Sequence, residues 1–136
     1  RPGRGCAMSF YDEVGGAATF EALVAAFYRG VAGDEPLRSL YPEAPELGPA
    51  ERRLRMFLEQ YFGGPKTYSE ERGHPRLRMR HVPYAVTMDQ RDRWLRHMVG
   101  ALETVIADGA PIDEAHADAM KDYFVRAADM LVNTPT

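Results

Sequence analysis

Apolar residues recur every three or four positions in four stretches of this sequence, which is the spacing of one face of an α-helix. The four stretches span residues 19–31, 50–61, 94–106 and 119–131. We find no segment that alternates apolar and polar residues with the period of two expected of a half-buried strand. The pattern therefore predicts an all-α fold with four main helices and several short ones.

Capping residues, prolines and glycines suggest where these helices begin and end. Thr19 is a suitable N-cap for the first helix, and Pro49 is well placed as the first residue of the second. The sequence Gly-Gly-Pro at 63–65 should end that second helix. Thr87 and Gln90 have the spacing of a capping box, in which each residue bonds to the other's backbone, and we expect them to open the third helix.

The segments between the main helices are less regular. Residues 34–42 predict a turn or a short helix that Pro42 ends. We expect a loop as far as His74, and then a short helix that begins at Pro75 and carries His81.

Length and charge limit the class of protein. With 136 residues and a net charge of -3, we expect a single domain over residues 9–136, and neither nucleic acid nor a membrane surface as a partner. Residues 1–8 read as a disordered extension. No apolar run approaches the roughly 20 residues that span a bilayer. Cys6 is the only cysteine, which excludes an intrachain disulfide and favours a reducing, cytoplasmic setting.

His81 lies in an unusually basic neighbourhood. The Leu77 carbonyl, one helical turn earlier, is placed to accept a hydrogen bond from Nδ1–H of His81, which would leave Nε2 for a metal. The cations around it are Lys66, Arg72, Arg76, Arg78 and Arg80. Two interpretations stay open: a packed or surface histidine beside a solvated face, or a metal ligand beside arginines that neutralise the carboxylates of an acidic cofactor such as a porphyrin.

Three polar aromatic residues fall on apolar helix faces or at a helix end: Tyr28, Tyr41 and Trp94. Each could be a core residue whose polar tip is satisfied locally, because buried O–H and N–H groups need partners. They could instead converge on one cavity that holds a small, polarised ligand. The spacing alone leaves both interpretations open.

From Ser9 to Asn133 the sequence resembles the group II (O-type) truncated haemoglobins. The matching stretches are "SFYDEVGG" (9–16), "TFEALVAAFY" (19–28), "LYPE" (40–43), "ERRLRMFLEQYFGGPKTYSEERGHPRLRMRHVPY" (51–84), "RDRWL" (91–95) and "MLVN" (130–133). The resemblance implies a truncated globin: a two-over-two helical sandwich around haem b. Two departures from the family pattern are Phe62, where relatives often have Trp, and a slightly longer linker at 44–49.

Carried over residue by residue, the resemblance implies a role for each candidate. His81 corresponds to the proximal iron ligand. The polar distal residues, which face the bound gas, are Tyr28, Tyr41 and Trp94. The distal cavity residues are Ala50, Leu54 and Phe57. The propionate contacts are Arg53 and Tyr68, with Arg78 as a further candidate.

The implied function is reversible, high-affinity binding of O2, with CO and NO as further ligands. The Trp94 indole N–H can only donate, so it presents no repelling lone pair to a bound gas. Slow release argues against bulk oxygen transport. An alternative on the same fold is redox chemistry, as an NO dioxygenase or a peroxidase acting on peroxide. That activity needs a separate reductase, because the chain has no Gly-rich dinucleotide loop. A haem-free helical interaction module with an acidic partner is a third interpretation, and a homo-oligomer stays open.

Three further histidines are weaker candidates. We expect His74 to cap the short helix after it, His97 to line the edge of the pocket, and His116 to face solvent. A zinc site built from the four histidines lacks any recognised ligand spacing.

Overall fold

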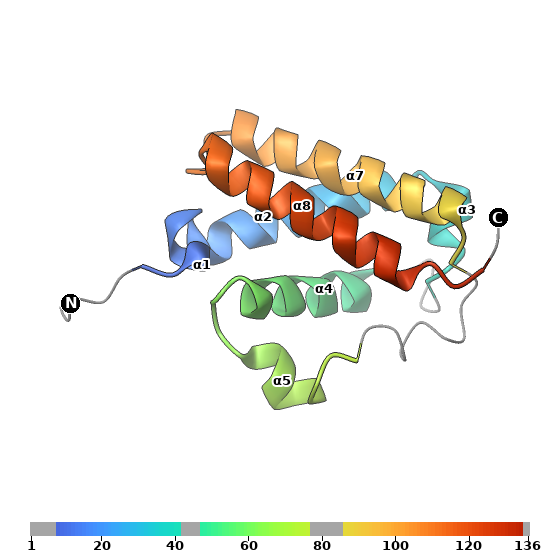
Figure 1. The fold of residues 1–136 in the computed structure, drawn as a ribbon, viewed down its shortest axis with the longest axis horizontal. Coiled ribbons are helices and arrows are strands. Elements are labelled where there is room, and N and C mark those ends of the chain that lie inside the picture. Colours follow the sequence, from blue (N-terminus) through green and yellow to red (C-terminus); the bar gives the residue numbers. More distant parts are fainter. Residues whose placement is uncertain (1–7, 42–46, 77–85, 135–136) are drawn as a thin grey trace.

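Helices account for nearly all the regular structure of the chain, and the computed structural model describes residues 8–41, 47–76 and 86–134 (Figure 1). The elements are α1 (Phe10–Glu13), α2 (Gly16–Ala32), α3 (Glu35–Arg38), α4 (Gly48–Tyr61), α5 (Thr67–Arg72), α7 (Met88–Ala107) and α8 (Glu114–Leu131). These described residues contain no strand. The all-α prediction is confirmed, with four long helices and several short ones.

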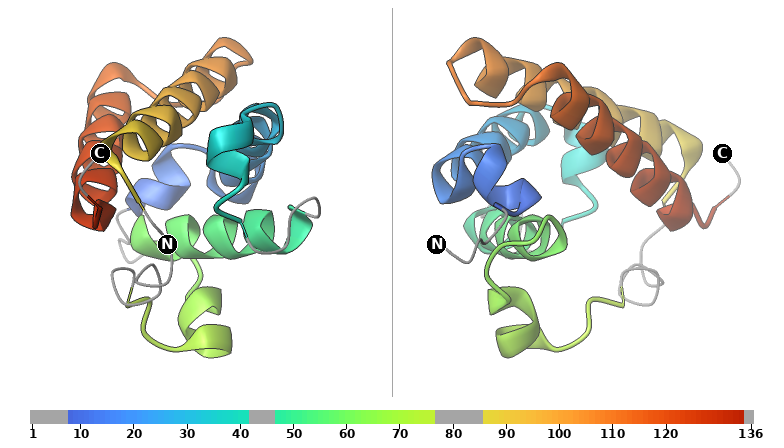
Figure 2. Two further views of the ribbon diagram at one scale, coloured as in Figure 1. Left: turned by 90° about the vertical axis from the view of Figure 1, so that its right-hand side faces the viewer. Right: turned by 60° about the vertical axis from the view of Figure 1, so that its left-hand side comes forward.

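The long helices form two packed pairs, α2 with α4 and α7 with α8 (Figures 1 and 2). Helices α7 and α8 lie side by side, joined by a short loop at residues 108–113. Helix α2 contacts both α7 and α4, so it joins the α7–α8 pair to the α4 layer. Helix α5 packs against α4 on the side away from that pair.

The core lies where the apolar faces of α2, α7 and α8 meet. The largest fully buried side chains are Phe20, Leu23, Phe27, Leu58, Met98, Leu102, Met120 and Phe124. They fall within the predicted apolar stripes, and each removes an apolar side chain from water, at about 1.5–3 kcal/mol for complete burial.

The first long helix begins earlier than the sequence suggested. Its N-cap is Gly15, whose φ of 110° is in the left-handed region that favours glycine. Thr19 lies inside the helix and is buried, and its Oγ1 donates to the Val14 carbonyl at 2.7 Å. The prediction of Thr19 as N-cap was therefore wrong, because its hydroxyl is satisfied by the preceding turn.

The capping box at the start of α7 is only half formed. Thr87 is the N-cap, and its Oγ1 accepts a hydrogen bond from the Gln90 backbone N–H at 3.1 Å. The Gln90 side chain does not return to Thr87; its Nε2 donates to the Pro36 carbonyl at 2.8 Å. Helix α4 begins at Gly48, one residue before Pro49.

Helix α5 lies where we expected only a loop. Gln60 of α4 holds it by two hydrogen bonds: Nε2 donates to Ser69 Oγ at 2.7 Å, and Oε1 accepts from the Ser69 backbone N–H at 2.9 Å. Pro75 and Arg76 are not helical. The rest of the short helix that we expected there, with His81, lies outside the described residues.

Helix α3 confirms the short element predicted within 34–42, and Pro42 lies outside the described residues. Among the described helices, none has both the length and the apolar character needed to cross a membrane.

Candidate haem pocket

A cavity of about 560 Å³ opens between α2, α4, α7 and α8. It is large enough for a small-molecule or cofactor site. Eight predicted site residues line it: Tyr28, Tyr41, Ala50, Arg53, Leu54, Phe57, Tyr68 and Trp94. The two remaining candidates, His81 and Arg78, lie outside the described residues. Every predicted site residue that the structure describes is therefore brought to one cavity.

Two of the lining tyrosines interact with each other. The Tyr28 and Tyr41 rings lie edge to face, with centroids 5.6 Å apart. The two hydroxyls share a hydrogen bond. Burial raises the pKa of Tyr28, helped by the neighbouring Tyr41, and burial raises the pKa of Tyr41 to about 12. Both phenols are neutral at physiological pH, and only one of their two protons is used in the shared bond.

Trp94 of α7 is held by aromatic contacts on two sides. Its ring meets Phe27 edge to face at a centroid distance of 5.4 Å and Phe124 at 6.1 Å. These contacts fix the plane of the indole, as expected of T-shaped pairs. Trp94 lines the cavity.

The α4 wall of the cavity is apolar. Ala50, Leu54 and Phe57 lie on one face of the helix because their spacing follows the helical turn. Ala50 is 4% exposed and offers no polar group. The polar groups that line the cavity therefore come from other parts of the lining, among them Tyr28, Tyr41, Gln90 and Trp94.

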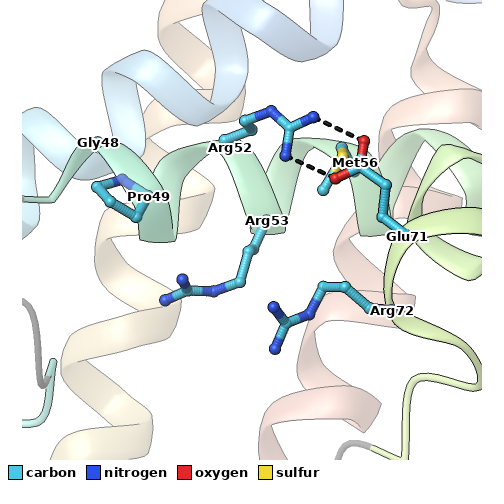
Figure 3. Close-up of a pocket in the computed structure, with 7 residues that line it drawn as sticks. All are labelled: Gly48, Pro49, Arg52, Arg53, Met56, Glu71 and Arg72. Atoms are coloured by element: carbon cyan, nitrogen blue, oxygen red, sulfur yellow. Dashed lines mark hydrogen bonds and ion pairs between the residues drawn. The ribbon is translucent and has the colours of Figure 1, made fainter.

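One edge of the cavity is cationic. Arg53 of α4 and Arg72 of α5 line both the cavity and an adjoining open groove of about 480 Å³ (Figure 3). Their guanidinium groups lie on the same side of α4 (Figure 3). Arg52 is drawn away from them by Glu71, to which it donates two hydrogen bonds of 2.9 and 2.7 Å.

Arg72 is a cavity residue to which sequence reasoning gave no role of its own. Its guanidinium carbon lies 5.9 Å from the centroid of the buried Tyr68 ring, one helical turn earlier on α5. That spacing was visible in the sequence, but the segment was interpreted as a loop, in which a four-residue spacing has no meaning.

The other histidines do not line the cavity. His97 donates from Nε2 to Asp34 Oδ2 at 2.8 Å, so its predicted place at the pocket edge was wrong. His116 is partly exposed at the surface, as predicted, with Nε2 2.9 Å from Glu13 and Nδ1 2.7 Å from Asp113. Nδ1 of His74 accepts from the Arg76 backbone N–H at 3.2 Å, within a turn. In the described ranges, no group of three or more His, Cys, Asp or Glu side chains could hold a metal.

Comparison with known proteins identifies this arrangement. The family model described as a bacterial-like globin matches residues 9–129. The chain belongs to this globin family. Within it, the chain is a group II truncated haemoglobin, as the relatives below indicate.

Three similar proteins illustrate the relationship. The group 2 truncated hemoglobin YjbI of Bacillus subtilis (strain 168) is 41% identical over 87 residues, 64% of each chain, so the match spans slightly less than two thirds of that relative. A thermostable hemoglobin from Thermobifida fusca superposes with a TM-score of 0.88 at 51% identity, covering 95% of this chain and 100% of that one. A truncated oxygen-avid haemoglobin from Bacillus subtilis superposes with a TM-score of 0.83 at 32% identity, covering 93% and 100%.

Membership of the globin family implies a haem cofactor, and the described residues fit one. The cavity has an apolar α4 wall for a flat hydrophobic body, and donors from Tyr41 and Trp94 for a ligand. Arg53 and Arg72 at one edge match acidic side groups, because guanidinium pairs well with carboxylates. The donor set and the cationic edge therefore suit a porphyrin that carries carboxylates.

Proposed function

We propose that this globin binds haem b in the cavity, with His81 as the axial ligand, and that it holds O2 with high affinity through Trp94 and Tyr41. The observation that supports the proposal is the convergence of eight predicted residues, from separate elements, on one cavity. The oxygen-avid character of the Bacillus subtilis haemoglobin is consistent with it.

When bound, haem iron held by one imidazole supplies a coordination position for a diatomic gas. The Trp94 indole N–H would donate to that gas, and it brings no lone pair that would repel a negative charge on it. The Tyr41 hydroxyl would donate as well, with Tyr28 hydrogen-bonded to it. Because the cavity wall is apolar, these bonds act in a medium of low dielectric, where they are stronger than in water.

The same donors favour some gases over others. O2 becomes more polar than CO on binding, so it gains more from the two donors. We therefore expect the distal residues to slow O2 release much more than CO release. NO is a further ligand in this proposal.

The cationic edge fixes the position of the cofactor in the cavity. Arg53 and Arg72 pair with the propionates, and the Arg72 guanidinium lies over the Tyr68 ring, which supports it. Arg78, one residue beyond Leu77 in the sequence, is a further candidate for the same role.

Oxygen dissociation kinetics of the haem-loaded protein test the distal part of the proposal. A hydrogen bond to a charged acceptor contributes about 1.5–3 kcal/mol, so Trp94→Phe should release O2 roughly ten- to over a hundredfold faster. The change in the CO off-rate should be much smaller. An unchanged O2 off-rate would remove Trp94 from the mechanism.

The visible spectrum tests the cofactor part. The wild type incubated with hemin should show a strong Soret band, and His81→Ala should lose haem or bind it weakly. His74→Ala is the matched control, since it removes a histidine that lies only seven positions away. A normal five-coordinate ferrous spectrum in His81→Ala would show that another residue is the axial ligand.

A further inference from the structure

Asp34 is a buried carboxylate at the start of α3, where it meets three side chains of α7: Arg93 and His97 at hydrogen-bond distance, and the exposed Arg96 at 3.7 Å. The side chain is 7% exposed. Arg93 Nη1 donates to its Oδ1 at 2.9 Å, and His97 Nε2 donates to its Oδ2 at 2.8 Å. A buried charge needs such partners, because burying it unpaired is very costly. We call Asp34, Arg93 and His97 the Asp34 clasp.

The carboxylate of the clasp is ionised. Burial alone would raise the pKa of Asp34, but hydrogen bonds from His97 and the Leu37 backbone N–H, with the charge of Arg93, hold it below its usual range. An ionised carboxylate only accepts, so the shared proton belongs to His97 Nε2.

Neighbouring contacts hold both members of the clasp on α7 in place. Arg93 Nε also donates to Asp89 Oδ2, one turn earlier on the same helix, at 2.8 Å. The His97 ring lies directly against Gly30 of α2, where an added Cβ would overlap with Nδ1. Gln90 adds a second link between α7 and α3 through the Pro36 carbonyl at 2.8 Å.

Each side of the clasp is linked, through the backbone, to a side chain that we propose as a donor in the cavity. On α7, Trp94 directly follows Arg93 and lies three residues before His97. On the α3 side, the Arg38 N–H bonds to the Asp34 carbonyl at 2.8 Å, and the Tyr41 N–H bonds to the Arg38 carbonyl at 3.0 Å. Asp34 itself does not line the cavity.

We propose that Asp34 is a positioning residue for the bound gas: by joining α3 to α7, it sets the distance between the Tyr41 hydroxyl and the Trp94 indole N–H, and so the rate at which O2 leaves. The proposal rests on the proposed function, because it acts through those two donors. A hydrogen bond weakens steeply with poor geometry, so a small shift of α3 relative to α7 is enough.

Two variants loosen the clasp in different ways. Asp34→Asn keeps the size of the side chain and an acceptor for the Leu37 N–H but removes the charge that Arg93 and His97 bind. Gly30→Ala keeps every charge and pushes His97 aside, while alanine suits the helix interior better than glycine. We expect O2 release to be about three- to thirtyfold faster in Asp34→Asn, less affected in Gly30→Ala, and CO release nearly unchanged in both.

A second measurement needs no cofactor. Trp94 is the only tryptophan of the chain, so the emission maximum and quenching of the apoprotein report its surroundings. Both variants should change these signals.

Asp113→Asn is the matched control. Asp113 also caps a helix, accepting from the His116 backbone N–H at 2.8 Å, and also pairs with a histidine, with 2.7 Å to His116 Nδ1. It does not line the cavity. Its substitution should lower stability yet leave O2 release and Trp94 emission as in the wild type.

The outcomes separate this proposal from the proposed function. Wild-type O2 release in Asp34→Asn and Gly30→Ala, where Trp94→Phe still releases O2 faster, overturns the role of the clasp and leaves the function intact. If the Trp94 emission of both variants equals that of the wild type, that result alone overturns the positioning role of the clasp. If Trp94→Phe leaves the O2 off-rate unchanged, the assignment of Trp94 as a donor is overturned instead.

Discussion

At the scale of single residues, Tyr28 and Tyr41 have different proposed roles. In the proposed function Tyr28 donates to Tyr41, and only the Tyr41 proton is directed at the ligand; the hydrogen bond between the two side chains supports this arrangement. An aromatic hydroxyl that is buried and already bonded acts on a ligand through its neighbour. Two residues that look alike in the sequence therefore have different expected effects.

We predict that Tyr41→Phe speeds O2 release more than Tyr28→Phe. The first variant removes a donor to the same charged acceptor, at about 1.5–3 kcal/mol, or roughly ten- to over a hundredfold in rate. The second removes only the group that orients it. Stopped-flow O2 dissociation on both variants provides the comparison, and a larger effect of Tyr28→Phe would reverse the assigned roles.

Thr19 offers a test of a buried hydroxyl. Thr19→Val keeps the shape of the side chain but leaves the Val14 carbonyl without its 2.7 Å bond. We expect a loss of about 1 kcal/mol in the free energy of unfolding, measured in urea. Thr19→Ser keeps the hydroxyl and serves as the control; equal losses in both variants would assign the effect to packing.

At the scale of elements, α5 depends on a neighbour for its place. Gln60 of α4 makes both hydrogen bonds to Ser69, and α5 in turn carries Tyr68 and Arg72 to the cavity edge. A helix of six residues is too short to be stable alone. The position of Arg72 at the cavity edge therefore depends on α4, through Gln60 and through the Arg52–Glu71 ion pair.

We predict that Gln60→Ala releases haem faster than the wild type, because α5 is freed and Arg72 loses its position. The rate of haem transfer to an excess of apomyoglobin measures this. Glu70→Gln changes an exposed side chain of α5, and this variant should transfer haem at the wild-type rate. Equal rates in Gln60→Ala and the wild type would show that α5 holds its place without Gln60.

The long and the short helices differ in how well the sequence predicts them. The four long helices were predicted because each buries a full stripe of apolar residues, as Phe20, Leu23 and Phe27 do in α2. Helix α5 was missed because bonds from α4 form it, and six residues are too few for a stripe. Thr19 was misassigned because the glycine that opens α2 does so through backbone conformation, which leaves no side-chain signal.

The candidate site was only partly predictable from residue patterns. Tyr28, Tyr41 and Trp94 come from three different parts of the chain, so spacing could not show that they meet; the family resemblance supplied that expectation. Tertiary pairs such as Asp34 with His97 lie 63 residues apart. No local pattern in the sequence marks them.

At the scale of the whole molecule, His116 joins the first helix, α1, to the start of the last helix, α8. Its ring bridges Glu13, at the end of α1, and Asp113, the N-cap of α8. The hydrogen bonds to Glu13 and then to Asp113 raise the pKa of His116 above its ordinary value. The folded state therefore binds the proton more tightly than the unfolded chain does.

This bridge predicts a direction for the pH dependence of stability. The contribution of His116 is fully present below its unfolded pKa of about 6.5 and is lost as the pH rises through the higher folded value. The difference in unfolding free energy between the wild type and His116→Gln should thus shrink from pH 6 to pH 9. Urea unfolding across that range measures it, and a constant difference would exclude the charged bridge.

The opening between the helix pairs has a consequence for how the molecule is assembled in a cell. Leu54 and Phe57 line the cavity and are only partly buried by the described residues, so a bound apolar cofactor would remove more of their surface from water. Mass action then couples folding to the supply of porphyrin, since a molecule that binds only the native form stabilises it in proportion to the logarithm of its concentration. In iron-starved cells this chain should be short-lived, and its abundance should track haem synthesis even if its gene is read at a constant rate.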